Sequence, residues 1–554
     1  MGIGGRFPSS AAAALLALSL PLAGRAGQPI TVQAASGPNV SVQQTLINQD
    51  RAANGLSALS WSDCLAAVAV QNAERIMAQG YLSHTNGASL DLDCGVGATQ
   101  GGENIAYMSG GIDDNQANTL FMNSAPHRAN ILGPYQYVAT AWSVAANGYA
   151  YVAEEFLGAS GTVVPAGVRP LPPVRILDTR TGVGGVPIAR LGPGGSLSVQ
   201  VAGAGGVPST GVGAVVLNVT VTDTTTASYL TVYPQGDPRP DASNLNWVAG
   251  QTVANLLQVA LRSPGQLTVY NAAGYTDVVF DVSGYVPRTA AAPAGDGLLN
   301  PLVPARILDP RDGTGGYRGQ LGPRQTLGLQ VAGRGGVPST GAEAVVFNLT
   351  ATGAHASPSG FLTAFPAGLP VPDASNLNFV AGQTVANRVI VKLGPGGQVN
   401  LFNAAGWVDA VVDVSGWYTD GIAATTGATF TGVTPVRILD TRSGIGGFRS
   451  KLPAGATIAV PVAGWGGVPV MSSSSPVPPT AVVLNVTATD PTAGTFLTVY
   501  PDGAARPGTS DLNVVAGQSL PNLVVVRIGG DGMVDVYNPA GSTDVIFDVV
   551  GWYG

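Results

Sequence analysis

The stretch "VRILDTR" at residues 174–180 recurs as "ARILDPR" at 305–311 and as "VRILDTR" at 436–442. A glycine-rich "VAGxGGVP" segment and a Val-rich run that contains an asparagine follow each occurrence. A period of about 130 residues is far longer than that of a solenoid repeat, so each copy is large enough to bury a core of its own. The sequence therefore predicts three copies of one domain, at residues 171–286, 302–418 and 434–553.

Each copy reads as an all-β domain. Runs such as "SYLTVYP" and "GAVVLNVTVTD" are rich in Val, Thr and Tyr, and Gly, Pro and Asn bound them. This pattern predicts an antiparallel β-sandwich, with a closed barrel as the alternative. The stretches "PRTAAAPAGDG" and "TDGIAATTGATFTG" between the copies are expected to be short semi-flexible spacers.

The chain before residue 160 has a different pattern. Helices are predicted from Val42 and Leu46 to Gly55, and from Ser62 to Gly80, with Leu65, Ala69, Asn72 and Ile76 along one stripe of the second. "DDNQANTLFMNS" is a third helix candidate, and Asn147-Gly148 between two apolar runs predicts a hairpin. Residues 42–158 are therefore expected to form an α+β domain.

Charge and the first segment bear on location and partners. The chain has 554 residues and a net charge of -7, with no basic stripe, which argues against a nucleic-acid partner. Arg6 precedes an apolar run, and small residues follow it, so residues 1–34 are expected to be a secretory signal peptide. We expect no transmembrane segment after its removal, and a protein that is secreted, extracellular and associated with the cell surface.

The chain has two cysteines, Cys64 and Cys94. In an exported protein such a pair favours one disulfide over two free thiols.

Two of the three histidines, His84 and His127, lie in the α+β domain with Glu103 between them. Two imidazoles and a carboxylate can bind a divalent metal, or can act as a base–acid set around a bound water. Their spacing places them on separate elements, so only the tertiary fold can bring them together. The alternative is that each histidine is a hydrogen-bonded turn residue.

The order of motifs in this domain resembles a bacterial CAP (SCP-like) domain, of the family that includes cysteine-rich secretory, antigen 5 and pathogenesis-related proteins. The resemblance covers about residues 42–157 and rests on residues that occur in the family's order: Asn48, Arg51, Leu59, Trp61, His84, Glu103, Asn104, Asn123, Ser124, His127, Arg128 and Ile131.

This resemblance implies an α-β-α sandwich with an open cavity that contains two histidines and two glutamates. His84, His127 and Glu103 match three of these four, while Ser124 stands where the family's other glutamate is expected. The set is incomplete, which weakens a four-ligand metal site and a carboxylate-pair mechanism. No cofactor is required, and a zinc-like metal at His84 and His127 would be exchangeable.

The repeats offer weaker candidates. Asp178 recurs in every copy with Arg175 and Arg180, as does the later Asp281, and such residues more often pair with each other than bind a ligand. Asn218, Asn348 and Asn485 match glycosylation sequons, but they lie in apolar strand runs, so we expect them to be cross-strand hydrogen-bonders. The repeats resemble modules of secreted actinobacterial surface proteins.

Three functions are compatible with these observations. The first is a non-enzymatic protein whose cavity binds a lipid, a sterol-like molecule or another apolar or cell-wall-derived ligand, with the β repeats attached to the cell envelope. The second is a metal-assisted, peptidase-like hydrolase that uses His84, Glu103 and His127. The third is a structural surface adhesin.

Overall fold

The computed structural model describes residues 31–34, 42–56, 58–84, 90–91, 94, 100–133, 135–158, 166–237, 239–262, 265–288, 295–355, 359–471 and 477–554. Apart from residues 31–34, the predicted signal peptide lies outside this part of the chain. The chain divides into two compact units, Met1–Val163 and Val164–Gly554. Within the described residues, no helix combines the length and the apolar character that a membrane span requires.

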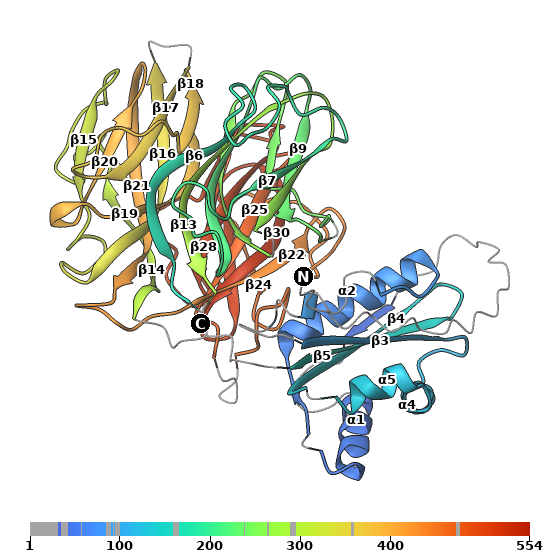
Figure 1. Ribbon diagram of the computed structural model, residues 1–554. Coiled ribbons are helices and arrows are strands. Elements are labelled where there is room, and N and C mark those ends of the chain that lie inside the picture. The colour runs from blue at the N-terminus through green and yellow to red at the C-terminus, as the bar shows by residue number, and fades with distance from the viewer. Residues whose placement is uncertain are drawn as a thin grey trace, which may run out of the picture. The chain divides into compact units, whose positions relative to one another are not determined.

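The N-terminal unit is an α-β-α sandwich, as expected (Figure 1). Its sheet has the order β1-β4-β5-β3, and β2 pairs with β4. Helix α2 packs on one face through Ala69, Ala73 and Ile76, while α1, α4 and α5 cover the other face. The elements are β1 (Thr31–Ala34), α1 (Val42–Ala53), β2 (Ser60–Trp61), α2 (Asp63–Gln79), β3 (Gln100–Met108), α4 (Asp114–Asn123), α5 (Ala125–Ile131), β4 (Tyr137–Val144) and β5 (Ala150–Gly158).

Local signals fixed the ends of these elements. The Ser62 side chain accepts a hydrogen bond from the Leu65 amide at the start of α2, and Gly80 ends the helix at a φ of 74°. The predicted β4–β5 hairpin turns at Asn147-Gly148. Helix α1 forms where it was predicted, with Val42 exposed at its start and Gln43, Ile47 and Arg51 on its buried face.

Each repeat of the C-terminal unit forms two antiparallel sheets, which is a sandwich and not a closed barrel. The sheets have four strands each, except that a short fifth strand joins the inner sheet of repeat 3. In repeat 1 the outer sheet has the order β10-β9-β12-β7 and the inner sheet β11-β8-β13-β6. The strands of repeat 1 are β6 (Arg169–Asp178), β7 (Ser196–Gln200), β8 (Val212–Thr222), β9 (Ser228–Pro234), β10 (Leu245–Trp247), β11 (Val253–Ala260), β12 (Gln266–Asn271) and β13 (Asp277–Pro287).

Repeats 2 and 3 keep this order. Repeat 2 comprises β14 (Asp296–Leu308), β15 (Thr326–Gln330), β16 (Ala342–His355), β17 (Ser359–Pro366), β18 (Leu377–Val380), β19 (Val385–Lys392), the 3-10 helix η1 (Pro395–Gly397), β20 (Gln398–Asn403) and β21 (Trp407–Asp420). Repeat 3 comprises β22 (Phe430–Asp440), β23 (Leu452–Pro453), β24 (Ala456–Pro461), β25 (Ala481–Thr489), β26 (Thr495–Pro501), β27 (Leu512–Val514), β28 (Leu520–Arg527), β29 (Met533–Asn538) and β30 (Ser542–Tyr553).

The inner sheets are buried on both faces. In β8, Val215 and Leu217 point into the core between the two sheets of repeat 1, whereas Val216 joins a second core that all three repeats share. This explains why these strands read as continuous apolar runs instead of alternating ones. The three repeats therefore form one unit around a common centre.

The second predicted spacer, residues 419–432, is not a separator. Leu299 and Ala428 exchange backbone hydrogen bonds of 2.7 and 2.8 Å, and the Phe430 amide donates to the carbonyl of Ala166. The Val168 amide donates in turn to Gly297 at 2.8 Å. The leading segments of the three repeats thus interlock, which ties the modules together.

Buried asparagines close the ring between repeats. One asparagine of each repeat donates its side-chain amide to the side-chain oxygen of an asparagine in a neighbouring repeat, and its own oxygen accepts a backbone N–H from that same neighbour. The donor–acceptor pairs are Asn255 with Asn485 (2.9 Å), Asn387 with Asn218 (2.8 Å) and Asn522 with Asn348 (2.9 Å).

One inter-repeat contact breaks this symmetry. Arg388 is 1% exposed, and its Nη2 lies 2.5 Å from the carboxylate of Asp511 in repeat 3. The positions equivalent to Arg388 hold Leu256 and Leu523, and the positions equivalent to Asp511 hold asparagine. Both departures occur together, so a buried ion pair replaces a Leu–Asn contact at one of the three junctions.

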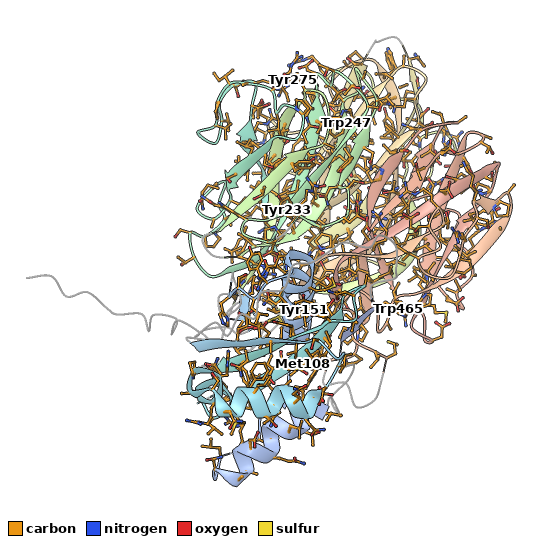
Figure 2. The ribbon with its side chains drawn as sticks, turned by 90° about the vertical axis from the view of Figure 1, so that its right-hand side faces the viewer. Met108, Tyr151, Tyr233, Trp247, Tyr275 and Trp465 are labelled. Carbon is orange, nitrogen blue, oxygen red and sulfur yellow. A yellow bond between two sulfur atoms is a disulfide. The ribbon has the colours of Figure 1, made fainter. Side chains whose placement is uncertain are left out.

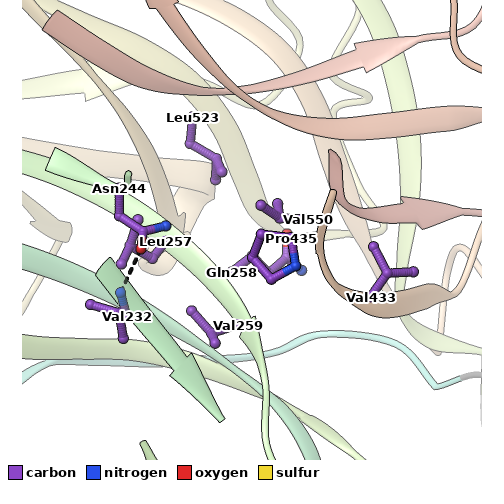
Figure 3. Close-up of a pocket in the computed structure, with 9 residues that line it drawn as sticks. All are labelled: Val232, Asn244, Leu257, Gln258, Val259, Val433, Pro435, Leu523 and Val550. Atoms are coloured by element: carbon purple, nitrogen blue, oxygen red, sulfur yellow. Dashed lines mark hydrogen bonds between the residues drawn. The ribbon is translucent and has the colours of Figure 1, made fainter. Parts of the chain in front are cut away.

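Repeats 1 and 3 also meet at a small pocket (Figure 3). A hydrogen bond of 2.6 Å from the Val232 amide to Asn244 Oδ1 closes one side of it. The lining is mostly apolar and comprises Val232, Asn244, Leu257, Gln258, Val259, Val433, Pro435, Leu523 and Val550.

The Arg388–Asp511 pair predicts a non-additive stability pattern. Removing one partner leaves the other charge buried, so Arg388→Leu and Asp511→Asn should each lower the free energy of unfolding by about 3–5 kcal/mol. The double variant recreates the Leu–Asn pair of the other junctions and should recover most of that loss. Calorimetric unfolding of the C-terminal unit measures this cycle, and additive losses in the double variant would contradict it.

Candidate functional site

His84 and Glu103 form a direct contact. His84 follows helix α2, where Arg75 holds the preceding Ser83 by hydrogen bonds of 2.8 Å to its hydroxyl and 2.9 Å to its carbonyl. Glu103 lies on β3, and its Oε2 is 2.6 Å from His84 Nδ1. The His84 side chain is 38% exposed, whereas that of Glu103 is only 2% exposed. A solvent-facing imidazole is therefore hydrogen-bonded to a buried carboxylate.

His127 lies on α5, whose first turn contains Pro126. Its backbone carbonyl accepts a 3.2 Å hydrogen bond from Asn104, and its ring meets the Phe121 ring edge-on with centroids 5.2 Å apart. Burial lowers the pKa of His127 below 6.5, and the nearby His84 lowers this pKa further. The ring is thus neutral at pH 7, and its nitrogens can donate and accept hydrogen bonds.

Further acids lie buried in this region, and the sequence analysis missed them. Asp91 and Glu155 are fully buried, and burial followed by nearby negative charge raises both pKa values well above the ordinary range. This direction keeps a proton on the pair and spares the fold two adjacent buried charges. Two consecutive glutamates in the apolar run "YVAEEF" were the available signal.

Amide side chains hold these acids in place. Asn72 donates to Glu155 at 2.8 Å, and Asn104 donates to Glu154 at 2.9 Å while it also contacts His127. Gln43 lies 2.5 Å from the other oxygen of Glu154. Asn104 therefore connects the segment that carries His127 to an acid on β5.

Other residues of the family motif are structural. Asn48 exchanges side-chain hydrogen bonds with the backbone of Leu59, at 2.8 and 3.1 Å. Arg51 donates hydrogen bonds of 2.8 Å to the carbonyls of Ile131 and Gly133 at the end of α5, where helix geometry leaves carbonyls without an intrahelical partner. These contacts position the helix that carries His127.

The predicted disulfide is confirmed, because Cys64 and Cys94 are bonded with their Cα atoms 5.6 Å apart. The amide of Cys94 donates to the Asp91 carbonyl at 2.9 Å, so the bridge also holds the segment that carries Asp91. Residues 85–89, 92–93 and 95–99 lie outside the described part, and the open cavity stays a prediction.

The hypothesis of a metal site requires a group of ligand side chains. Within the described residues, no three His, Cys, Asp or Glu side chains are grouped in a way that could hold an ion. Glu103 is engaged by His84 at one oxygen, and its other oxygen lies 3.7 Å from Arg75. Ser124 joins α4 to α5, and its side chain makes no cap hydrogen bond.

The charged residues of the repeats pair with each other. Arg180 donates to Asp178 at 2.7 and 2.9 Å, and Arg175 bonds Asp281, with the same pairs in the other two repeats. Asn218 is 2% exposed and donates to a carbonyl of the neighbouring repeat at 2.5 Å. The bond therefore runs between repeats and not between adjacent strands of one sheet, and burial makes these sequons inaccessible.

Residues 44–156 match the model of the cysteine-rich secretory protein family, CAP. This match supports a CAP-domain protein and covers the unit that contains His84, Glu103 and His127. No curated protein matches the chain.

Three solved structures are similar at low level. A chain from the structure described as the triple jelly roll fold and turret assembly in an archaeal virus is 10% identical with a TM-score of 0.14. The match covers 71% of this chain and 90% of that one. The N-terminal CBM22-1-CBM22-2 tandem domain of Paenibacillus barcinonensis Xyn10C is 11% identical with a TM-score of 0.14, and the match covers 45% of this chain and 98% of that one. A chain from the structure of Sulfolobus Turreted Icosahedral Virus is 10% identical with a TM-score of 0.13, and the match covers 78% of this chain and 94% of that one. At these TM-scores the likenesses carry no argument.

Glu154 predicts a pH dependence of stability. Burial raises its pKa to about 7 from an ordinary 4.5. Between these values the folded chain binds a proton that the unfolded chain has lost, so stability falls as the pH rises from 4.5 to 7, by about 3 kcal/mol. Glu154→Gln should flatten this slope. Urea unfolding at several pH values, followed by the helical circular-dichroism signal of the N-terminal unit, measures it; an unchanged slope would contradict the assignment.

Proposed function

We propose that the N-terminal unit is a non-enzymatic binding module of a secreted protein, and that the C-terminal unit holds the protein at the cell envelope. The ligand would have an apolar body and a polar group, such as a lipid or a cell-wall-derived molecule. His84 and His127 would bind the polar group, because one imidazole is solvent-facing and the other is neutral.

The observation that carries this proposal is the burial of Glu103. A side chain that is 2% exposed and bonded to His84 is poorly placed to activate a water molecule, but it is well placed to fix the orientation of the imidazole. The ring then presents its other nitrogen, Nε2, to a ligand. Binding makes use of this arrangement without a metal or a nucleophile.

A hydrolase remains the second candidate, favoured by the His84–Glu103 dyad itself. A histidine oriented by a carboxylate is the arrangement that general-base catalysis uses. This role would need a nucleophile or a bound water near His84. Ser124 has no described bond to either histidine, which places the hydrolase behind the binding function.

Export and envelope attachment rest on other features. A signal-like first segment and the Cys64–Cys94 bridge are typical of exported proteins. The alternative of a purely structural adhesin differs from our proposal only in the N-terminal unit. It would leave the two histidines without a role in ligand retention.

Ligand retention should depend on the two histidines. We expect mass spectrometry of organic extracts from the purified full-length chain to find a co-purified molecule, and its amount to fall about tenfold or more in His84→Ala and His127→Ala. His355→Ala is the matched control, because His355 is exposed in repeat 2. It should retain the molecule in full.

Two results would overturn the binding function. The first is an extract of the native chain that contains nothing beyond buffer components. The second is a turnover of peptide or ester substrates that His84→Ala abolishes while the disulfide and the helical signal persist.

A further inference from the structure

In repeat 2 an exposed aromatic ring packs against a glycine. Trp407, at the start of β21, is 45% exposed. A Cβ placed on Gly322 would lie 3.3 Å from Cη2 and Cζ3 of this indole, so the ring rests against a residue with no side chain. Repeat 1 has the same arrangement with Tyr275 over Gly192, at the outer end of its sandwich (Figure 2), while repeat 3 has Ser542 and Pro453.

In repeat 2, two glutamine side chains are fixed by hydrogen bonds close to this ring in the chain. Gln325 accepts a 2.8 Å hydrogen bond from the Gly322 amide and donates to the Tyr317 hydroxyl at 3.1 Å. Gln320 donates to Asp409 at 3.1 Å and to the Gly353 carbonyl at 2.8 Å. The position of Gln325 is glycine in repeat 1 and alanine in repeat 3, so this polar rim is specific to repeat 2.

A residue with a strained backbone, Arg324, lies two positions after Gly322. Arg324 has a φ of 59°, in the left-handed region that disfavours long side chains. The equivalent positions in repeats 1 and 3 hold Gly194 and Gly455, at 66° and 74°. Arg324 is exposed and has no described hydrogen bond or ion pair among the residues that the structure places. Backbone strain at a residue that a glycine would relieve points to a role for the side chain.

We propose that Trp407, Arg324 and the Tyr317–Gln325 rim of repeat 2 form a binding site for an acidic saccharide. The apolar C–H face of a sugar ring packs on the negative face of the indole, and its hydroxyls bond to the amides and the phenol. Arg324 pairs with the carboxylate of the sugar. This inference rests on the proposed envelope role of the C-terminal unit and names its ligand class.

The test uses the full-length chain on an array of immobilised glycans that carry uronic, sialic or muramic acids, beside neutral sugars. We expect the native chain to bind acidic glycans. Trp407→Ala should lose at least tenfold in affinity for all of them. Arg324→Gly should lose the preference for acidic over neutral glycans, and should unfold at the same temperature as the native chain or higher because glycine suits this turn. Tyr275→Ala, the matched aromatic without the rim, should bind like the native chain.

Absence of binding by the native chain to every acidic glycan would overturn the site, and so would equal losses in Trp407→Ala and Tyr275→Ala. Co-sedimentation of the full chain with cell envelopes separates this from the proposed function. Sedimentation without glycan binding contradicts the saccharide site alone. Glycan binding without sedimentation contradicts the envelope role alone.

Discussion

A polar group removed from water must find a partner inside the protein, and this constraint shapes both units. In the N-terminal unit it acts on the buried carboxyl groups of Glu103, Asp91 and Glu155. Glu103 is compensated by His84 and Arg75, and Asp91 and Glu155 retain a proton between them because of burial. The buried Glu103 carboxylate finds its partner in His84, and this contact fixes the orientation of the His84 ring. The proposed binding depends on that orientation.

The same constraint joins the repeats of the C-terminal unit. Each inner sheet buries asparagines against another repeat, and their donors and acceptors match only when all three repeats are present. The three repeats therefore form a pseudo-trimer, in which three equivalent domains of one chain pack around a common centre. Because the three repeats belong to one chain, equivalent positions can hold different residues, as Arg388 and Asp511 do at one junction and Arg324 and Gln325 at one surface.

Sequence reasoning succeeded where local chemistry decides the structure. The Ser62 cap, the Gly80 end and the Asn147-Gly148 turn are short-range signals, and they predicted α2 and the β4–β5 hairpin. The Val-, Thr- and Tyr-rich runs bounded by turn residues predicted the sandwiches.

It failed where packing decides. The sequence predicted the α1 helix but not its buried face, in which Gln43 and Arg51 are buried with their hydrogen bonds made. The convergence of Asp91 with Glu155, and the shared centre of the repeats, depend on contacts between segments far apart in the chain.

The proposal that His84 and His127 share one site is most directly tested by imidazole NMR titration of the histidine-labelled chain, whose sequence has three histidines. The account predicts that His127 titrates below 6.5 and that its pKa rises in His84→Ala, since a neighbouring imidazole is removed. A His127 that titrates at or above 6.5, and does not respond to the loss of His84, would contradict a shared site.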